Sequence, residues 1–347
     1  MVSDVSFGKI FALNLNKINS MPYIIYISVI SALLLVFGLW VASEIKKCKS
    51  SKEELQAGID RQDGQITELQ KTNALKQDEL NGIVEAYDSA AKDLKASIHY
   101  AERIQRAVIP QASEFKSLFP DCFIYFSPRD IVSGDFYTCA SSPEYRIAIV
   151  ADCTGHGVPG GFLSMLGMSA LKDLLSKQKI SKNFNPGDIL NSLRQFVLTS
   201  LSEESEDDAA TVSDGMDISL CAFNNDFTQI RYAAANHTIY VCRGGEIIKL
   251  KGNRMPIGRH PKQDVPFETF TFDLMKGDTV YLCSDGIQDQ FGSADDIKFT
   301  TKRLAAMLLE HSQEPLQQQK ASISTIVDDW KKGRDQFDDQ TLIGIRI

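Results

Sequence analysis

The hydrophobic and polar positions divide the 347-residue chain into three stretches of different character. The first, residues 23–42 (YIIYISVISALLLVFGLWVA), carries no charge and has the length that an α-helix needs to span a bilayer. Tyr23, Tyr26 and Trp40 lie towards its ends, where aromatic side chains meet the membrane interface. The pattern predicts one transmembrane helix.

Two rival interpretations fit this apolar run less well. A cleaved signal peptide needs a basic start, a shorter apolar core and a small-residue cleavage site, and charge-free runs this long are uncommon in soluble cores. More lysines follow the apolar run than precede it, and such an excess marks the cytoplasmic side of a membrane helix. It predicts that residues 1–22 form a short extracytoplasmic N-terminus and that the chain after the helix lies in the cytoplasm, anchored in the inner (cytoplasmic) membrane. The lysines before and after the run are Lys9 and Lys17, then Lys46, Lys47, Lys49 and Lys52.

Residues 43–110 are predicted to form a cytoplasmic coiled coil or linker helix that ends at Pro110. Its seam shows a 3-4 spacing, and an extra four-residue step after Tyr87 is a stutter, which locally unwinds a supercoil. A homodimer and a solvated single-helix spacer both remain open, and the dimer is favoured because apolar seam positions on a lone helix would be left in water. The seam positions are Leu55, Ile59, Gln62, Ile66, Leu69, Asn73, Lys76, Leu80, Ile83 and Tyr87, then Ala91, Leu94, Ile98 and Ala101.

The third stretch, residues 115–347, has the mixed texture of a globular α+β domain. Many short strands with a few long helices between them suggest a sandwich of sheets flanked by helices. The acidic segment 202–217 is predicted to be a surface loop, with a position beside a functional site as the second interpretation. Strands are expected at 122–127, 145–151, 217–223, 228–235, 238–243, 246–250, 267–272 and 278–284, and helices at 160–178, 186–202, 300–312 and 316–332.

Charge and cysteine usage narrow the function classes. The formal net charge of −8 argues against nucleic acid as a partner, because phosphate binding depends on clustered Lys and Arg. The seven cysteines are dispersed without a CxxC pair, which is typical of reduced thiols in a cytosolic setting. Most of them are expected to be small core residues.

Four acidic positions stand at strand ends or tight turns of the globular part. They are Asp135 in SGDFY, Asp152 in ADCTGHG, Asp285 in CSDGIQDQFG and the pair Asp338–Asp339 in FDDQTLIG. Converging carboxylates repel one another unless cations neutralise them, and oxygen ligands select hard ions such as Mg²⁺ or Mn²⁺. No HExxH, Walker or GxSxG motif competes. The pattern indicates a hydrolytic site for divalent metal.

The ordered set GDFY, ADCTGHGVPGGFLSM, PIGR, SDGIQDQFG and DDQTLIG resembles the PPM-type metal-dependent protein serine/threonine phosphatases. More narrowly, it resembles the branch of the sporulation stage II E phosphatase and the stress-response sigma-regulator phosphatases. The resemblance covers residues 115–347, and residues 97–110 resemble the helix that enters the catalytic domain in that branch. It implies a β-sandwich of two antiparallel sheets flanked by helices, with two Mn²⁺ or Mg²⁺ ions at one end.

The resemblance also implies a role for each acid. Asp152 resembles the carboxylate that bridges both ions, with the backbone carbonyl of Cys153 on one of them. Asp285 and Asp338 resemble the ligands of the other ion. Asp135 resembles an acid that holds metal-bound water, and it is counted with the metal site. Asp135 and Asp152 are therefore the expected catalytic residues.

Three further residues are candidates for the site. Asp339 is expected to support the ligands from behind, although either member of the Asp338–Asp339 pair can be the ligand. His156 could orient the GHG turn, act as an acid or be a structural histidine. Arg129 is a candidate contact for phosphate.

The expected function is a membrane-anchored phosphatase that hydrolyses phosphoserine or phosphothreonine on a regulatory protein by attack of a two-metal-bound hydroxide. The resemblance implies an anti-sigma-factor antagonist as substrate. The alternative from another class is a non-catalytic membrane scaffold whose phosphatase-like domain binds a partner. A small-molecule phosphohydrolase is the third reading.

Overall fold

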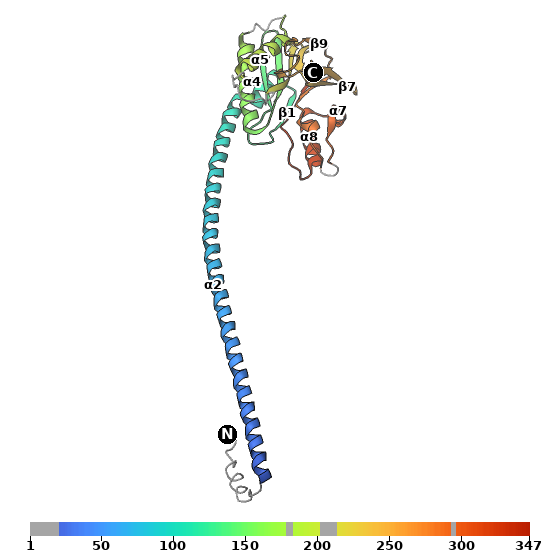
Figure 1. The fold of residues 1–347 in the computed structure, drawn as a ribbon. Helices are drawn as coiled ribbons and strands as arrows, with labels where there is room; N and C mark the ends of the chain where they lie inside the picture. Colours follow the sequence, from blue (N-terminus) through green and yellow to red (C-terminus); the bar gives the residue numbers. More distant parts are fainter. Residues whose placement is uncertain (1–20, 178–182, 202–213, 293–295) are drawn as a thin grey trace. The chain divides into compact units, whose positions relative to one another are not determined.

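The computed structural model describes residues 21–177, 183–201, 214–292 and 296–347. The chain forms two compact units, Met1–Ala90 and Ala91–Ile347. In its described part the first unit is helix alone, the greater part of α2 (Met21–Val108; Figure 1). The last turns of α2 belong to the second unit, which holds all the strands.

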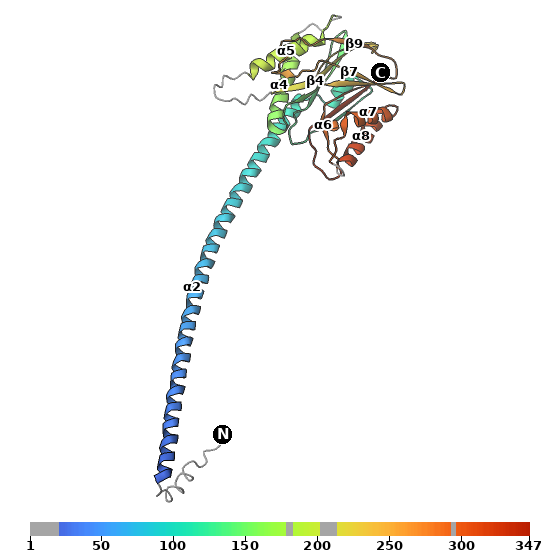
Figure 2. The ribbon, with the colours of Figure 1, turned by 45° about the vertical axis from the view of Figure 1, so that its right-hand side comes forward.

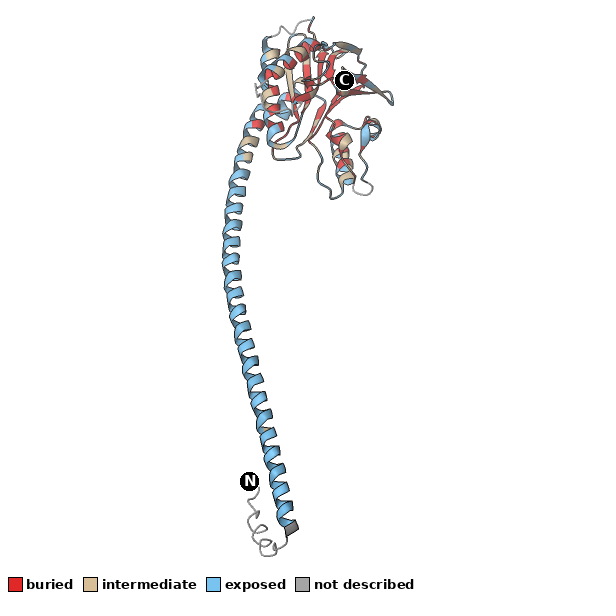
Figure 3. Ribbon diagram, viewed as in Figure 1, coloured by how far each residue is buried: buried red, intermediate tan, exposed pale blue. Residues whose placement is uncertain are grey.

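Helix α2 contains both the apolar run and the predicted coiled-coil segment. By length and composition it is the one candidate membrane span in the described ranges, and its apolar window is not packed into any core. Figure 3 shows the side of α2 coloured as exposed along the first unit. The helix ends at Val108, two residues before Pro110, because proline lacks an amide N–H and disfavours helical geometry in the residue before it.

The second unit is built on two antiparallel sheets, as the sequence predicted. One has five strands in the order β1-β11-β10-β6-β7, and the other has the order β2-β3-β4-β5-β9, with the short β8 paired to β4. The first sheet comprises β1 (Cys122–Ser127), β6 (Thr238–Arg243), β7 (Glu246–Lys251), β10 (Thr279–Cys283) and β11 (Gln340–Arg346). The second comprises β2 (Phe136–Ser141), β3 (Tyr145–Cys153), β4 (Gly215–Asn224), β5 (Gln229–Ala235), β8 (Ile257–Gly258) and β9 (Phe270–Asp273).

Helices cover both outer faces of the sandwich, which gives four layers (Figure 2). Helices α4 and α5 pack on the β2–β9 sheet, through residues such as Leu171 and Leu190. Helices α7 and α8 pack on the other sheet, through Leu308 and Ile323. The buried residues in Figure 3 concentrate in the strands between them. The helices of the unit are α3 (Ala112–Leu118), α4 (Gly157–Lys177), α5 (Pro186–Ser200), α6 (Gly286–Asp289), α7 (Thr300–His311) and α8 (Leu316–Lys331).

Three strands were not predicted: β2, β8 and β11. Strand β11 contains Gly344, and a Cβ there would lie 2.3 Å from the Phe123 ring, so the glycine that weakens the strand pattern makes room for packing. The loop prediction for 202–217 was wrong at its end, because β4 begins at Gly215 and pairs with both β3 and β8. Residues 202–213 lie outside the described residues.

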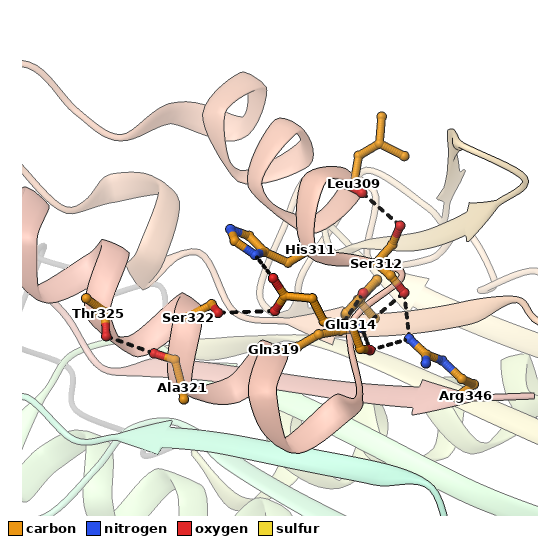
Figure 4. Close-up of polar contacts among 10 residues, drawn as sticks. Leu309, His311, Ser312, Glu314, Gln319, Ala321, Ser322, Thr325 and Arg346 are labelled. Atoms are coloured by element: carbon orange, nitrogen blue, oxygen red, sulfur yellow. Dashed lines mark hydrogen bonds and ion pairs between the residues drawn. The ribbon is translucent and has the colours of Figure 1, made fainter.

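The turn between α7 and α8 is tied to the end of β11 (Figure 4). Arg346 Nη2 donates to the carbonyl oxygens of Ser312 at 2.5 Å and Glu314 at 2.9 Å. The Glu314 carboxylate accepts from Ser322 at 3.1 Å and lies 2.9 Å from His311 Nδ1. The bonds of Arg346 satisfy two carbonyls of the α7–α8 turn, one of them at the C-cap of α7, and so fix this turn to β11.

Candidate functional site

The ends of strands from both sheets bring the predicted acids together. Asp152 lies near the end of β3, Asp285 comes two residues after β10 as the N-cap of α6, and Asp338 comes two residues before β11. Asp152 and Asp285 are within hydrogen-bonding range of each other. Burial is the main cause that raises the pKa of Asp152 well above its ordinary value, and the charges of Asp135, Asp285 and Asp338 add to it. The four acids therefore form one electrostatic group.

Asp135 is the most buried of these acids, with an exposed fraction of 1%. Its Oδ2 accepts from Ser284 Oγ at 2.5 Å and Thr341 Oγ1 at 2.7 Å, whereas Oδ1 has no hydrogen-bond partner among the described residues. Burial raises the pKa of Asp135 to about 8, against the two hydroxyl bonds, which lower it. A buried carboxylate oxygen without a partner is costly, and a cation would relieve that cost.

The neighbours Asp338 and Asp339 differ in what their oxygens do. Asp339 accepts from the backbone N–H of Arg129 at 2.7 Å through Oδ1, and from that of Gly134 at 2.6 Å through Oδ2. Both of its oxygens therefore hold the loop that precedes Asp135. Asp338 is half-buried and accepts through Oδ1 from the Asp339 N–H at 2.9 Å. This division favours Asp338 as the ligand and Asp339 as its support.

The ADCTGHG turn packs closely against the loop that carries Asp135. Gly155 and Gly157 have φ angles of 84° and 64°, a region that favours glycine. A Cβ at Gly134 would lie 2.5 Å from the Gly155 carbonyl oxygen and 3.2 Å from that of Cys153, and a Cβ at Gly160 would lie 2.1 Å from the Gly155 oxygen. Small residues on both sides are thus required for the turn to present its carbonyls beside the acids.

His156 and Arg129 lie at the rim of the acidic group. His156 Nδ1 is 2.9 Å from Asp130 Oδ2, and both side chains are about half exposed. The Arg129 guanidinium donates from Nη1 to the Phe337 carbonyl at 2.9 Å and is exposed. Burial raises the pKa of Asp338, and the charges of His156 and Arg129 act against that rise. The rim therefore holds two basic groups next to a candidate ligand.

Two residues of the site region were missed from the sequence. Asp217 lies opposite Asp152 in the β3–β4 pairing, and burial raises its pKa to about 6. Gln105, at the end of α2, donates to the Ser133 carbonyl at 2.6 Å and accepts from the Ser133 N–H at 3.1 Å, two positions before Asp135. The predicted strand 217–223 already contained Asp217, but nothing in the sequence indicated that this residue pairs with Asp152. No sequence signal separates Gln105 from the other glutamines of α2.

The donor set of the site fits a hard divalent cation. All the converging groups are carboxylates or backbone carbonyls, which suit Mg²⁺ or Mn²⁺, and the unpartnered Asp135 Oδ1 and the raised pKa values mark uncompensated negative charge. In the part of the chain that the structure describes, no three His, Cys, Asp or Glu side chains are gathered closely enough to hold a metal ion as they stand.

Comparison with known proteins agrees with this architecture. The SiaA PP2C domain of Pseudomonas aeruginosa is 29% identical, with a TM-score of 0.65, and the match covers 75% of this chain and 98% of that domain. The PP2C domain and regulatory fragment of SpoIIE from Bacillus subtilis share the fold at 17% identity and a TM-score of 0.52, over 65% of this chain and 63% of that one.

Sequence comparison points the same way. The phosphoserine phosphatase RsbU of Bacillus subtilis (strain 168) is 24% identical over 205 residues, which are 57% of this chain. The match spans only 55% of the length of RsbU. The family model of stage II sporulation protein E (SpoIIE) matches residues 142–347, which include β3, β10 and β11 with Asp152, Asp285 and Asp338. The chain belongs to the SpoIIE family of PP2C-fold proteins.

Proposed function

We propose that this protein is a membrane-anchored, metal-dependent protein serine/threonine phosphatase. The observation that carries the proposal is the group of acids at the end of the sandwich where strands of both sheets meet. In this group Asp135 Oδ1 has no partner among the described residues, and the charges of three other carboxyl groups act on Asp152. Such a group repels itself and is suited to cations and to the charge of a phosphate bound through them. The sequence similarity to RsbU, which is named a phosphoserine phosphatase, supports phosphate-ester hydrolysis as the reaction.

The residues take the following parts in the proposed reaction. Asp152, with the backbone carbonyl of Cys153, Asp285, Asp338 and Asp135 would hold two Mn²⁺ or Mg²⁺ ions. When bound, the two ions supply an activated water and clamp the oxygens of the phosphate for in-line displacement. Asp135 is held by two hydroxyls through Oδ2, so Oδ1 is the acceptor that remains for a water.

The rim residues would handle the substrate. The exposed Arg129 guanidinium has one amino group fixed on the Phe337 carbonyl, which leaves further N–H groups to donate to a phosphate oxygen. The contact with Asp130 fixes Nδ1 of the half-exposed His156 imidazole. His156 is then a candidate proton donor to the departing serine or threonine oxygen.

The proposed substrate is a phosphorylated regulatory protein, with an anti-sigma-factor antagonist as the favoured class. A structure of the RsbU and RsbW domains of a Mycobacterium tuberculosis protein shares this fold over 59% of its length. The apolar stretch of α2 would anchor the chain in the cytoplasmic membrane, with residues 43–110 as a coiled-coil linker that forms a homodimer and residues 115–347 as the cytoplasmic phosphatase domain. No role for nucleic acid is expected.

The experiment is phosphate release from an aryl phosphate by the full chain in detergent, with and without Mn²⁺. We expect activity that depends on Mn²⁺ and that Asp152→Asn removes, while Asp226→Asn, at an exposed position of the β4–β5 turn, leaves it intact. A non-catalytic scaffold would release no phosphate in any arm. Comparison of a phosphoserine peptide with free metabolite phosphates separates a protein phosphatase from a small-molecule phosphohydrolase.

A further inference from the structure

Asp217 belongs to none of the acidic motifs, yet β4 brings it to the same end of the sandwich. It is the Cα partner of Asp152 in the antiparallel pairing of β3 and β4, and residues directly opposite each other point to the same face of a sheet. The charge of Asp285 contributes to the raised pKa of Asp217, so these two carboxyl groups are also electrostatic neighbours. Asp217 therefore faces the acids of the proposed metal centre.

The turn after β5 is built to hold the Asp217 side chain. Asn236 donates from Nδ2 to Asp217 Oδ1 at 2.9 Å. Its φ of 55° lies in the left-handed region that non-glycine residues seldom occupy, and its backbone N–H is fixed on the Asn253 carbonyl at 2.9 Å. A Cβ at Gly252 would lie 2.1 Å from the Ala234 carbonyl oxygen, so the supporting loop packs directly against β5. The strained turn and its support orient one oxygen of Asp217.

The other oxygen of Asp217 is available. Among the described residues no donor other than Asn236 contacts this carboxylate, and the residue is half-buried rather than free in solvent. Asp135 is an independent sign that this end of the sandwich suits a cation, because it is buried, its Oδ1 has no partner among the described residues, and its charge acts on Asp152. A fifth carboxylate would worsen the repulsion among these acids unless a cation offsets it.

We propose that Asp217 is a fifth carboxylate of the metal centre, held through Oδ1 by Asn236 so that Oδ2 binds a divalent cation beside Asp285. This inference rests on the proposed metal-dependent function and adds to it. With Asp217 included, five carboxylates rather than the four motif acids would surround the bound cations. Asp217 thus increases the affinity for Mn²⁺ or Mg²⁺, and Asn236 is its positioning residue.

The test is a calorimetric titration of Mn²⁺ into the full chain in detergent. Asp217→Asn keeps an oxygen that can accept from Asn236 and removes only the charge, so we expect the weakest Mn²⁺ step to weaken about tenfold. Asn236→Ala should move the same step in the same direction by less. Asp226→Asn, on the exposed β4–β5 turn, serves as the charge-matched control and should bind as the wild type does.

A melting experiment separates loss of cation binding from loss of the fold. Without metal, Asp217→Asn should melt no lower than the wild type, because one repulsive charge is gone, and Mn²⁺ should raise its melting temperature by less. If Asp217→Asn binds Mn²⁺ as tightly as a wild type that releases phosphate, the inference is wrong and the proposed function stands. If the wild type binds no Mn²⁺, the inference and the metal-dependent function are both wrong.

Discussion

Replacing Gln105 by alanine tests how strongly the end of α2 supports the site. Gln105 has an exposed fraction of 4% and makes three hydrogen bonds, two with the backbone of Ser133 and one with Ser164 Oγ at 2.8 Å. In Gln105→Ala the Ser133 carbonyl keeps the Ser164 hydroxyl at 3.1 Å, but the buried Ser133 N–H loses its acceptor. An orphaned buried N–H costs roughly 1–3 kcal/mol, and the void left by the shortened side chain costs about 1 kcal/mol more.

We therefore expect Gln105→Ala to lower the free energy of unfolding of the second unit by roughly 2–4 kcal/mol. Guanidinium unfolding of the full chain in detergent, in a Trp40→Phe background, isolates the fluorescence of Trp330, the other tryptophan of the chain. Gln77→Ala is the matched control, because Gln77 is an exposed glutamine of the same helix. A loss no larger than that of the control would refute the account of Gln105.

Three further predictions concern the turn, the acids and the linker. Gly160→Ala should destabilise the second unit and lower phosphate release, because its Cβ would lie 2.1 Å from the Gly155 carbonyl oxygen of the ADCTGHG turn. Gly64→Ala, with open space around it, should melt no lower than the wild type. Folding raises the pKa of Asp135 from 3.8 to about 8, so the stabilisation by its protonated form is full below pH 3.8 and is lost as the pH rises through about 8. The melting temperature in chelator should therefore fall between pH 3.8 and about 8, and Mn²⁺ should offset the fall. Ile83→Lys, on the predicted seam, should convert a sedimenting dimer of the full chain in detergent to monomer, and Asn81→Lys, off the seam, should leave the dimer; a monomeric wild type would contradict the coiled-coil proposal.

The sequence predicted the sandwich and its outer helices because these elements have strong local patterns. Runs such as IAIVA in β3 and the amphipathic α7 carry their own hydrophobic signal. Strand β11 carries a weaker one, since Gly344 is explained only by the Phe123 ring of a strand more than two hundred positions earlier. The missed strand was thus specified by tertiary packing.

The same limit applies to the site. The motif acids could be selected because each stands near a strand end or in a tight turn, but their hydrogen-bond partners could not be predicted. The hydroxyls on Asp135 come from Ser284 and Thr341, 149 and 206 positions away. Asp217 was predicted at the boundary between the acidic loop 202–217 and the strand 217–223, and only the pairing with β3 places it opposite Asp152.

The most direct test of the account is the rate of phosphate release from a phosphoserine peptide by the full chain in detergent with Mn²⁺. Phosphate release should stop on chelation, and its rate should fall by at least about 100-fold in both Asp152→Asn and Asp285→Asn. Phosphate release that persists in chelator, or that survives either substitution, would contradict the proposal that these carboxylates form a metal-dependent phosphatase site.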